Sequence, residues 1–158
     1  MKVARVATGF GDIPGLTTLN VFTVGCSRRC AGCHNPTLWD KDNPAAFKID
    51  GQGIMDKFDQ GLHDAVCWLG GEPTEQANLV KVAGELKGKG IRQVLYTGLE
   101  PHEITSEVME LMDAVVAGPW RGLPGNGHKT VISGGWAGPF ETLHSILNVN
   151  VNVNERAA

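Results

Sequence analysis

The sequence lacks several features that define whole classes of protein. It contains no apolar run long enough to cross a membrane, and its N-terminus has no secretory signal. Its net charge of −3 excludes the basic field that draws proteins to nucleic acid or anionic lipid. It has only four cysteines, three of them clustered, which is typical of metal binding in a reducing compartment rather than of a disulfide framework. We therefore expect one cytoplasmic domain over residues 1–158, with neither nucleic acid nor a membrane as partner.

The clustered cysteines, Cys26, Cys30 and Cys33, are spaced C-x3-C-x2-C, so the chain can curl around one soft metal centre. The remaining cysteine, Cys67, lies far downstream in an apolar run, where we expect it to belong to the core. Clusters held by thiolates usually have four of them, so three leave one iron with an open coordination position. The pattern therefore predicts a reactive iron–sulfur cluster. A zinc knuckle completed by His34 is the alternative, although no second ligand pair follows.

Apolar runs that alternate with amphipathic stretches predict an α/β fold, and their order predicts parallel strands joined by helices. The Gly- and Pro-rich stretch after residue 118 is predicted to be irregular. The Asn/Val alternation over residues 148–154 fits either an edge strand or a frayed terminus. Strands are predicted over residues 19–24, 65–69, 91–97, 113–117 and 129–133, and helices over residues 50–62, 75–87, from 101 onward and 139–147.

Three of the predicted strands end in residues suited to ligand binding. Strand 19–24 runs into the cysteine loop, strand 65–69 is followed by Gly-Gly-Glu-Pro at residues 70–73, and strand 91–97 ends at Tyr-Thr-Gly, residues 96–98. The carboxyl ends of parallel strands meet on one rim, so we expect these segments to form one site. Two glycines let another backbone or a ligand approach without a Cβ clash, and the following carboxylate can receive an ammonium group. A plain strand-to-helix turn is the alternative for residues 70–73.

With these motifs in this order, the chain resembles the radical S-adenosylmethionine (SAM) superfamily. In that superfamily three cysteines hold three irons of a 4Fe–4S cluster, and SAM chelates the fourth through its amino and carboxylate groups. One-electron reduction then cleaves SAM to methionine and a 5′-deoxyadenosyl radical. The resemblance implies an incomplete parallel (β/α) barrel of the small radical SAM type. It assigns the metal ligands to Cys26, Cys30 and Cys33, and cofactor contacts to Gly70, Gly71, Glu72, Thr97, His34 and Asn35.

Within the superfamily, the chain is most similar to the activating proteins of anaerobic (class III) ribonucleotide reductase. The similarity rests on Gly32 before the third cysteine, on His34 and Asn35 after it, and on the nearby Trp39. It implies that the chain installs a glycyl radical on the large subunit of anaerobic ribonucleotide reductase. It also implies a low-potential electron donor such as flavodoxin.

Two other functions remain compatible with the sequence. One is a small radical SAM enzyme that acts on a small molecule, similar to 7-carboxy-7-deazaguanine synthase. The other is a non-catalytic Cys-metal module. If the chain is an activase, we predict that residues 118–127, with Trp120 and Arg121, dock the partner protein and order on binding, because a loop this poor in buried side chains belongs to the low-stability part of a structure.

Overall fold

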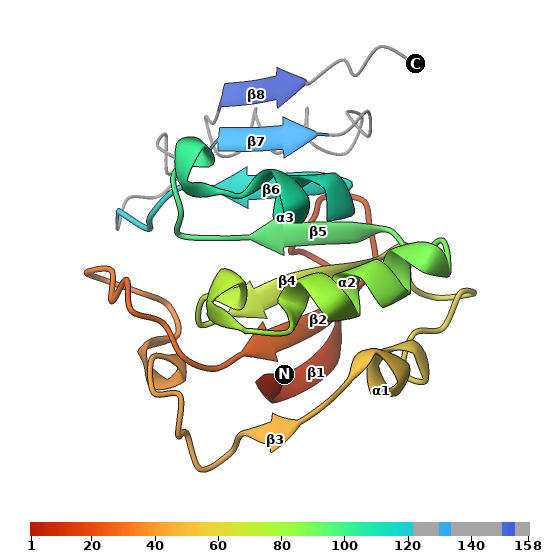
Figure 1. Ribbon diagram of the computed structural model, residues 1–158, viewed down its shortest axis with the longest axis horizontal. Helices are drawn as coiled ribbons and strands as arrows, with labels where there is room; N and C mark the ends of the chain where they lie inside the picture. Colours follow the sequence, from red (N-terminus) through yellow and green to blue (C-terminus); the bar gives the residue numbers. More distant parts are fainter. Residues whose placement is uncertain (122–129, 134–149, 154–158) are drawn as a thin grey trace.

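The computed structural model describes residues 1–121, 130–133 and 150–153 (Figure 1). These residues form one eight-stranded sheet with the order β3-β1-β2-β4-β5-β6-β7-β8. The strands are β1 (Lys2–Gly9), β2 (Thr18–Thr23), β3 (Phe47–Lys48), β4 (Ala65–Gly70), β5 (Gln93–Tyr96), β6 (Ala114–Ala117), β7 (Thr130–Ser133) and β8 (Asn150–Val153), and the helices are α1 (Gly51–Met55), α2 (Leu79–Gly88) and α3 (Ser106–Leu111).

The centre of the sheet is parallel, as the alternation of strands and helices predicts. Strand β2 pairs with β4, β4 with β5, and β5 with β6, all in parallel. The three helices lie on one face of these strands (Figure 1), and their apolar side chains join a single core cluster. Parallel strands that follow one another in order, with helices on one side, are the arrangement of a (β/α) barrel. In the described residues this barrel is not closed, because β3 and β8 are the two edges of the sheet. The predicted fold class, an incomplete parallel (β/α) barrel, is confirmed.

Two strands, β1 and β3, were not predicted from the sequence. The pairing of β1 with β2 is antiparallel, and its register shifts between Val3 and Arg5. A bulge of this kind interrupts the alternation of faces, so Val3 and Val6, three residues apart, both contact the same core cluster. The apolar residues of β1 are therefore irregularly spaced and give no strand pattern in the sequence. Strand β3 has only two residues, both exposed, and gives no pattern either.

The helix predicted over residues 50–62 is shorter than expected and ends at Met55. Its start is as predicted, because the Asp50 carboxylate accepts a hydrogen bond from the Gly53 N–H at 2.8 Å. Beyond the helix, Asp59 makes local bonds instead: its carboxylate accepts from Gly61 N, and its own N–H donates to His63 Nδ1. Such local bonds offer the backbone an alternative to the helix.

Of the elements predicted after residue 118, the structure shows two strands, and the others lie outside the described residues. Strand β7 is present but runs antiparallel to β6, and β8 then pairs with β7 in parallel. Strand β8 confirms the edge-strand reading of the Asn/Val tail. The helix predicted over residues 139–147 and the stretch 122–129 lie outside the described residues. Of the helices in the described part of the chain, none reaches the length and apolar character that a membrane span needs.

The face of the sheet opposite the helices carries a smaller core cluster of its own. The segment before β2 crosses this face, where Ile13 is fully buried and the Tyr96 hydroxyl donates to the Asp12 carbonyl at 2.6 Å. Cys67, expected in the core, is completely buried in this cluster. Burial raises the pKa of its thiol well above the usual value, so Cys67 stays protonated and unreactive.

Candidate functional site

The cysteine loop leaves the carboxyl end of β2 and returns to it. Gly25 N donates to the Leu38 carbonyl at 2.8 Å, and Cys26 N donates to the Trp39 carbonyl at 3.1 Å. These two bonds close the base of the loop, so Cys30 lies in a segment that projects from the strand end.

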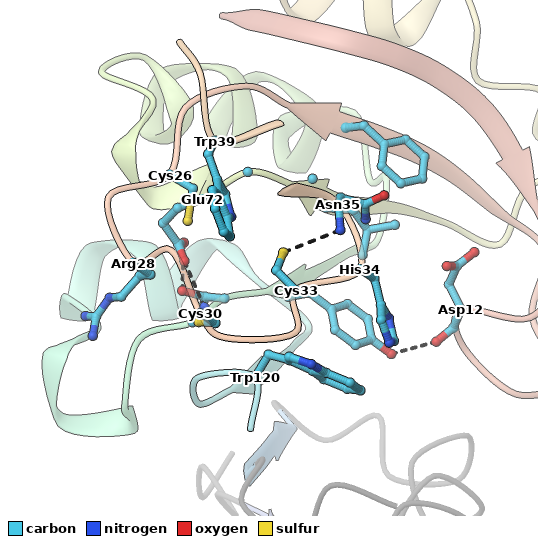
Figure 2. Close-up of a pocket in the computed structure, with 17 residues that line it drawn as sticks. Asp12, Cys26, Arg28, Cys30, Cys33, His34, Asn35, Trp39, Glu72 and Trp120 are labelled. Atoms are coloured by element: carbon cyan, nitrogen blue, oxygen red, sulfur yellow. Dashed lines mark hydrogen bonds between the residues drawn. The ribbon is translucent and has the colours of Figure 1, made fainter. Parts of the chain in front are cut away.

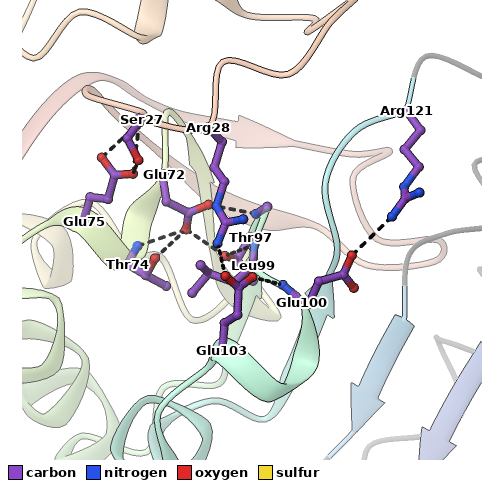
Figure 3. A network of polar contacts seen from close by, with 11 residues as sticks. Ser27, Arg28, Glu72, Thr74, Glu75, Thr97, Leu99, Glu100, Glu103 and Arg121 are labelled. Atoms are coloured by element: carbon purple, nitrogen blue, oxygen red, sulfur yellow. Dashed lines mark hydrogen bonds and ion pairs between the residues drawn. The ribbon is translucent and has the colours of Figure 1, made fainter.

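Two carboxylates from later parts of the chain hold the outer side of this loop (Figure 3). The Ser27 N–H and hydroxyl donate to Glu75 Oε1 at 3.0 and 2.6 Å. Arg28 forms an ion pair with Glu103, with 2.7 Å between Nη2 and Oε1. The hydrogen bond from Arg28 holds the pKa of Glu103 below its usual value. The Arg28 side chain is thus tied to the fold by Glu103.

One cavity of about 340 Å³ brings the predicted residues together (Figure 2). It is formed where the ends of β2, β4 and β5 meet, as the rule for parallel strands predicts. Its walls include all nine residues that the sequence singled out: Cys26, Cys30, Cys33, His34, Asn35, Gly70, Gly71, Glu72 and Thr97.

Glu72 is buried, and its carboxylate is occupied by donors of the protein itself (Figure 3). Oε1 accepts from the Thr97 hydroxyl at 2.7 Å and from the hydroxyl and N–H of Thr74 at 2.8 and 3.2 Å. Oε2 accepts from Gly98 N at 2.8 Å. The side chain therefore ties the end of β4 to the end of β5. Its predicted role as an acceptor for a ligand ammonium group competes with these bonds, and holding the rim together is the role that the geometry supports.

We expect Glu72→Gln to destabilise the protein by about 2 kcal/mol, because one carboxylate oxygen becomes an amide that faces donors and leaves them unpaired. Thermal unfolding of the variant measures this loss. Glu110→Gln, at an exposed position of α3, is the matched control and should change stability by about 0.5 kcal/mol or less. Equal melting temperatures for Glu72→Gln and the parent would contradict a structural role for Glu72.

The two glycines of the motif are required by the chain's own backbone. A Cβ on Gly71 would lie 2.4 Å from the Gly25 oxygen and 3.0 Å from the Leu38 oxygen. Gly70 has φ +105°, and its Cβ would meet the Thr23 backbone at 2.5 Å. From the sequence, the glycines were expected to admit either another backbone or a ligand. The structure shows a close backbone, because the base of the cysteine loop packs directly on the end of β4.

The cavity has a donor set that fits an iron–sulfur cluster and SAM. Three thiols line it, and burial raises the pKa of Cys26, opposed by backbone N–H groups of Arg28 and Arg29 that favour the thiolate. In the described residues, no three His, Cys, Asp or Glu side chains converge on a point that could hold one metal ion. A cluster sets a different requirement, because each thiolate binds its own iron. The cavity also contains buried N–H donors without acceptors, on Trp39 and Trp120.

Other residues of the cavity wall were not among the predicted cofactor contacts. Trp120, from the predicted docking run, follows β6 and lies against His34, with 4.2 Å between ring centroids. The rule for strand ends, applied to β6, accounts for its place at this rim. Asp12 and Phe22 also line the cavity and carried no local signal. Arg121 pairs with Glu100, while residues 122–127 of the predicted docking run lie outside the described residues.

Comparison with known proteins agrees with the chemistry of this cavity. The family described as a 4Fe–4S single cluster domain matches residues 12–129. The pyruvate formate-lyase-activating enzyme of Clostridium pasteurianum is 28% identical over 154 residues, which cover 92% of this chain and 62% of the relative. The enzyme of the same name from Streptococcus mutans is 30% identical over 118 residues, which cover 69% of this chain and 43% of the relative. The chain thus spans less than two thirds of either relative.

Proposed function

Because this chain belongs to the 4Fe–4S single cluster domain family, we propose that it is a radical SAM activase that installs a glycyl radical on a partner protein. The proposal rests on one observation: three thiols, residues 70–72 and Thr97 all line the same cavity. The two relatives named as activating enzymes support the same class. The cofactors are a 4Fe–4S cluster and SAM, as the sequence predicted.

Each group of residues has a separate role in this proposal. Cys26, Cys30 and Cys33 would bind three irons and leave the fourth for SAM. The backbone of the Gly-Gly-Glu motif, together with Thr97, His34 and Asn35, would contact SAM in the same cavity. When bound, the cofactors supply one-electron cleavage of the SAM sulfonium. The chain itself orients the reactants and excludes water from them, so that little reorganisation precedes the reaction.

The partner we propose is the large subunit of anaerobic ribonucleotide reductase. The support is the sequence around the third cysteine, where Gly32 adopts φ +71° and is followed by His34 and Asn35. A low-potential donor such as flavodoxin would supply the electron in the cytoplasm, and residues 1–158 would act as one domain. The names of the relatives provide a second candidate partner, pyruvate formate-lyase.

Electron paramagnetic resonance tests the proposal. The protein is reconstituted anaerobically with iron and sulfide, reduced, and mixed with SAM and either candidate partner. We expect a glycyl radical doublet with the ribonucleotide reductase subunit and none with a variant of that subunit whose radical glycine is alanine.

A doublet with pyruvate formate-lyase alone would correct the partner and keep the activase function. A brown protein that cleaves SAM but activates neither partner would favour an enzyme that acts on a small molecule. A colourless protein with stoichiometric zinc would leave only the Cys-metal module.

A further inference from the structure

Two buried polar side-chain atoms in the described part of the chain lack a hydrogen-bond partner, and they share one location. They are the indole nitrogens of Trp39 and Trp120, and both side chains line the cavity that contains the three cysteines. Native proteins pair nearly all of their buried polar groups, so each exception needs an explanation. Two exceptions in the same cavity point to acceptors that a bound group supplies.

A third tryptophan shows how this fold satisfies an indole when no ligand is involved. Trp68 is completely buried in β4, and its Nε1 donates to Gln93 Oε1 at 3.1 Å. Gln93 is held in turn, because its amide donates to the Ala83 carbonyl at 2.9 Å. The core therefore supplies an oriented acceptor for its own indole. The cavity supplies none for Trp39 or Trp120.

Of the two unpaired indoles, Trp39 is the one fixed to the cysteine loop. Its carbonyl accepts the hydrogen bond from Cys26 N at 3.1 Å, so its backbone position is set by the first cysteine. Figure 2 shows its ring beside Cys26 on one wall of the cavity, whereas Trp120 lies with His34 on another. The same loop already directs one N–H at a ligand sulfur, since Asn35 N donates to Cys33 Sγ at 3.4 Å.

Building on the proposed function, we propose that the Trp39 indole N–H donates a hydrogen bond to a sulfur atom of the bound cluster and raises its reduction potential. Sulfur is the acceptor that a cluster at these three cysteines places beside Trp39. Reduction makes the cluster more negative, so a donor to its sulfur stabilises the reduced state more than the oxidised one. Trp39 thereby makes the cluster easier to reduce by the electron donor.

Trp39→Phe tests this inference, because it keeps an aromatic ring and removes the N–H. The parent and variant are reconstituted with iron and sulfide, and their midpoint potentials are measured without SAM by titration monitored with electron paramagnetic resonance. We expect full iron content and a more negative midpoint in the variant. Trp68→Phe, which removes an indole N–H away from the cavity, is the control and should leave the midpoint unchanged.

A second measurement detects the hydrogen bond directly. Electron–nuclear double resonance of the reduced parent, before and after exchange into D2O, should reveal an exchangeable proton that is absent from Trp39→Phe. If that variant does not hold a cluster, benzothienylalanine at position 39 replaces the N–H by sulfur in a ring of the same shape and serves instead.

Three results would overturn the inference: an unchanged midpoint in a fully loaded variant, an exchangeable proton that persists in it, or a shift that appears only when SAM is added. The last result would assign the indole to SAM. Failure of the parent to assemble any cluster would instead count against the proposed function, so the two failures are distinguishable.

Discussion

Replacing Cys26, Cys30 or Cys33 by alanine should abolish both cluster binding and SAM cleavage. A 4Fe–4S cluster with an open iron already has one protein ligand fewer than usual, and the loss of another thiolate leaves too few to hold it. In the described residues no spare cysteine can substitute, because Cys67 is buried in β4 and does not line the cavity. The measurements are iron per chain and absorbance near 400 nm after anaerobic reconstitution.

Cys67→Ala is the control for this prediction. It should keep full iron content and lose about 1 kcal/mol of stability, since a small buried side chain is truncated. A Cys67→Ala variant without a cluster would mean that the open position is occupied by a protein thiolate. An alanine variant at position 26, 30 or 33 with normal iron would remove that residue from the ligand set.

Replacing Gly71 by alanine should also cost the protein its cluster. The new Cβ would be placed 2.4 Å from the Gly25 oxygen, and backbone atoms cannot step aside as a flexible side chain can. Gly25 and Leu38 form the base of the cysteine loop, so β4 and the loop must separate. We expect iron content to fall by more than half, and a loss of about 3 kcal/mol of stability, at the upper end of the cost of overpacking.

Gly88→Ala, at the end of α2, provides a matched control. A Cβ at this position meets no atom within 4 Å, and alanine favours a helix over glycine. Its iron content should equal that of the parent, with stability unchanged or higher. A Gly71→Ala variant with weak SAM binding and normal iron would instead show that the cavity, rather than the loop base, depends on Gly71.

The segments that carry the cysteines, the Gly-Gly-Glu motif and Thr97 were predictable because one topological rule applies to all of them. Parallel strands bring their carboxyl ends together, so three segments far apart in the sequence could be assigned to one cavity. The partners of each residue were not predictable in the same way. Glu72 is satisfied by Thr97 and Gly98, which lie 25 and 26 residues further along the chain. A carboxylate in a sequence carries no sign of whether distant donors already occupy it.

The same limit explains what was missed in the fold. The bulge in β1 places Val3 and Val6 on one face, and no periodicity predicts where a bulge occurs. The length of α1 was overestimated because the apolar spacing continues past Met55, whereas the chain there forms turns, in which Lys57 N donates to the Ile54 carbonyl and Asp59 makes local bonds. In both cases local backbone geometry decided the outcome, and the hydrophobic pattern carries no record of it.

The two carboxylates that hold the cysteine loop, Glu75 and Glu103, come later in the chain than the cysteines, which bears on when the cluster can be inserted. Ser27 is held by Glu75, 48 residues later, and Arg28 by Glu103, 75 residues later. When the cysteines leave the ribosome, these carboxylates have not been made, and the loop has nothing to fix its outer side. We therefore expect the metallocofactor to be inserted after translation, into a chain that is already folded. This is the reverse of a zinc finger, in which metal binding drives the chain to fold.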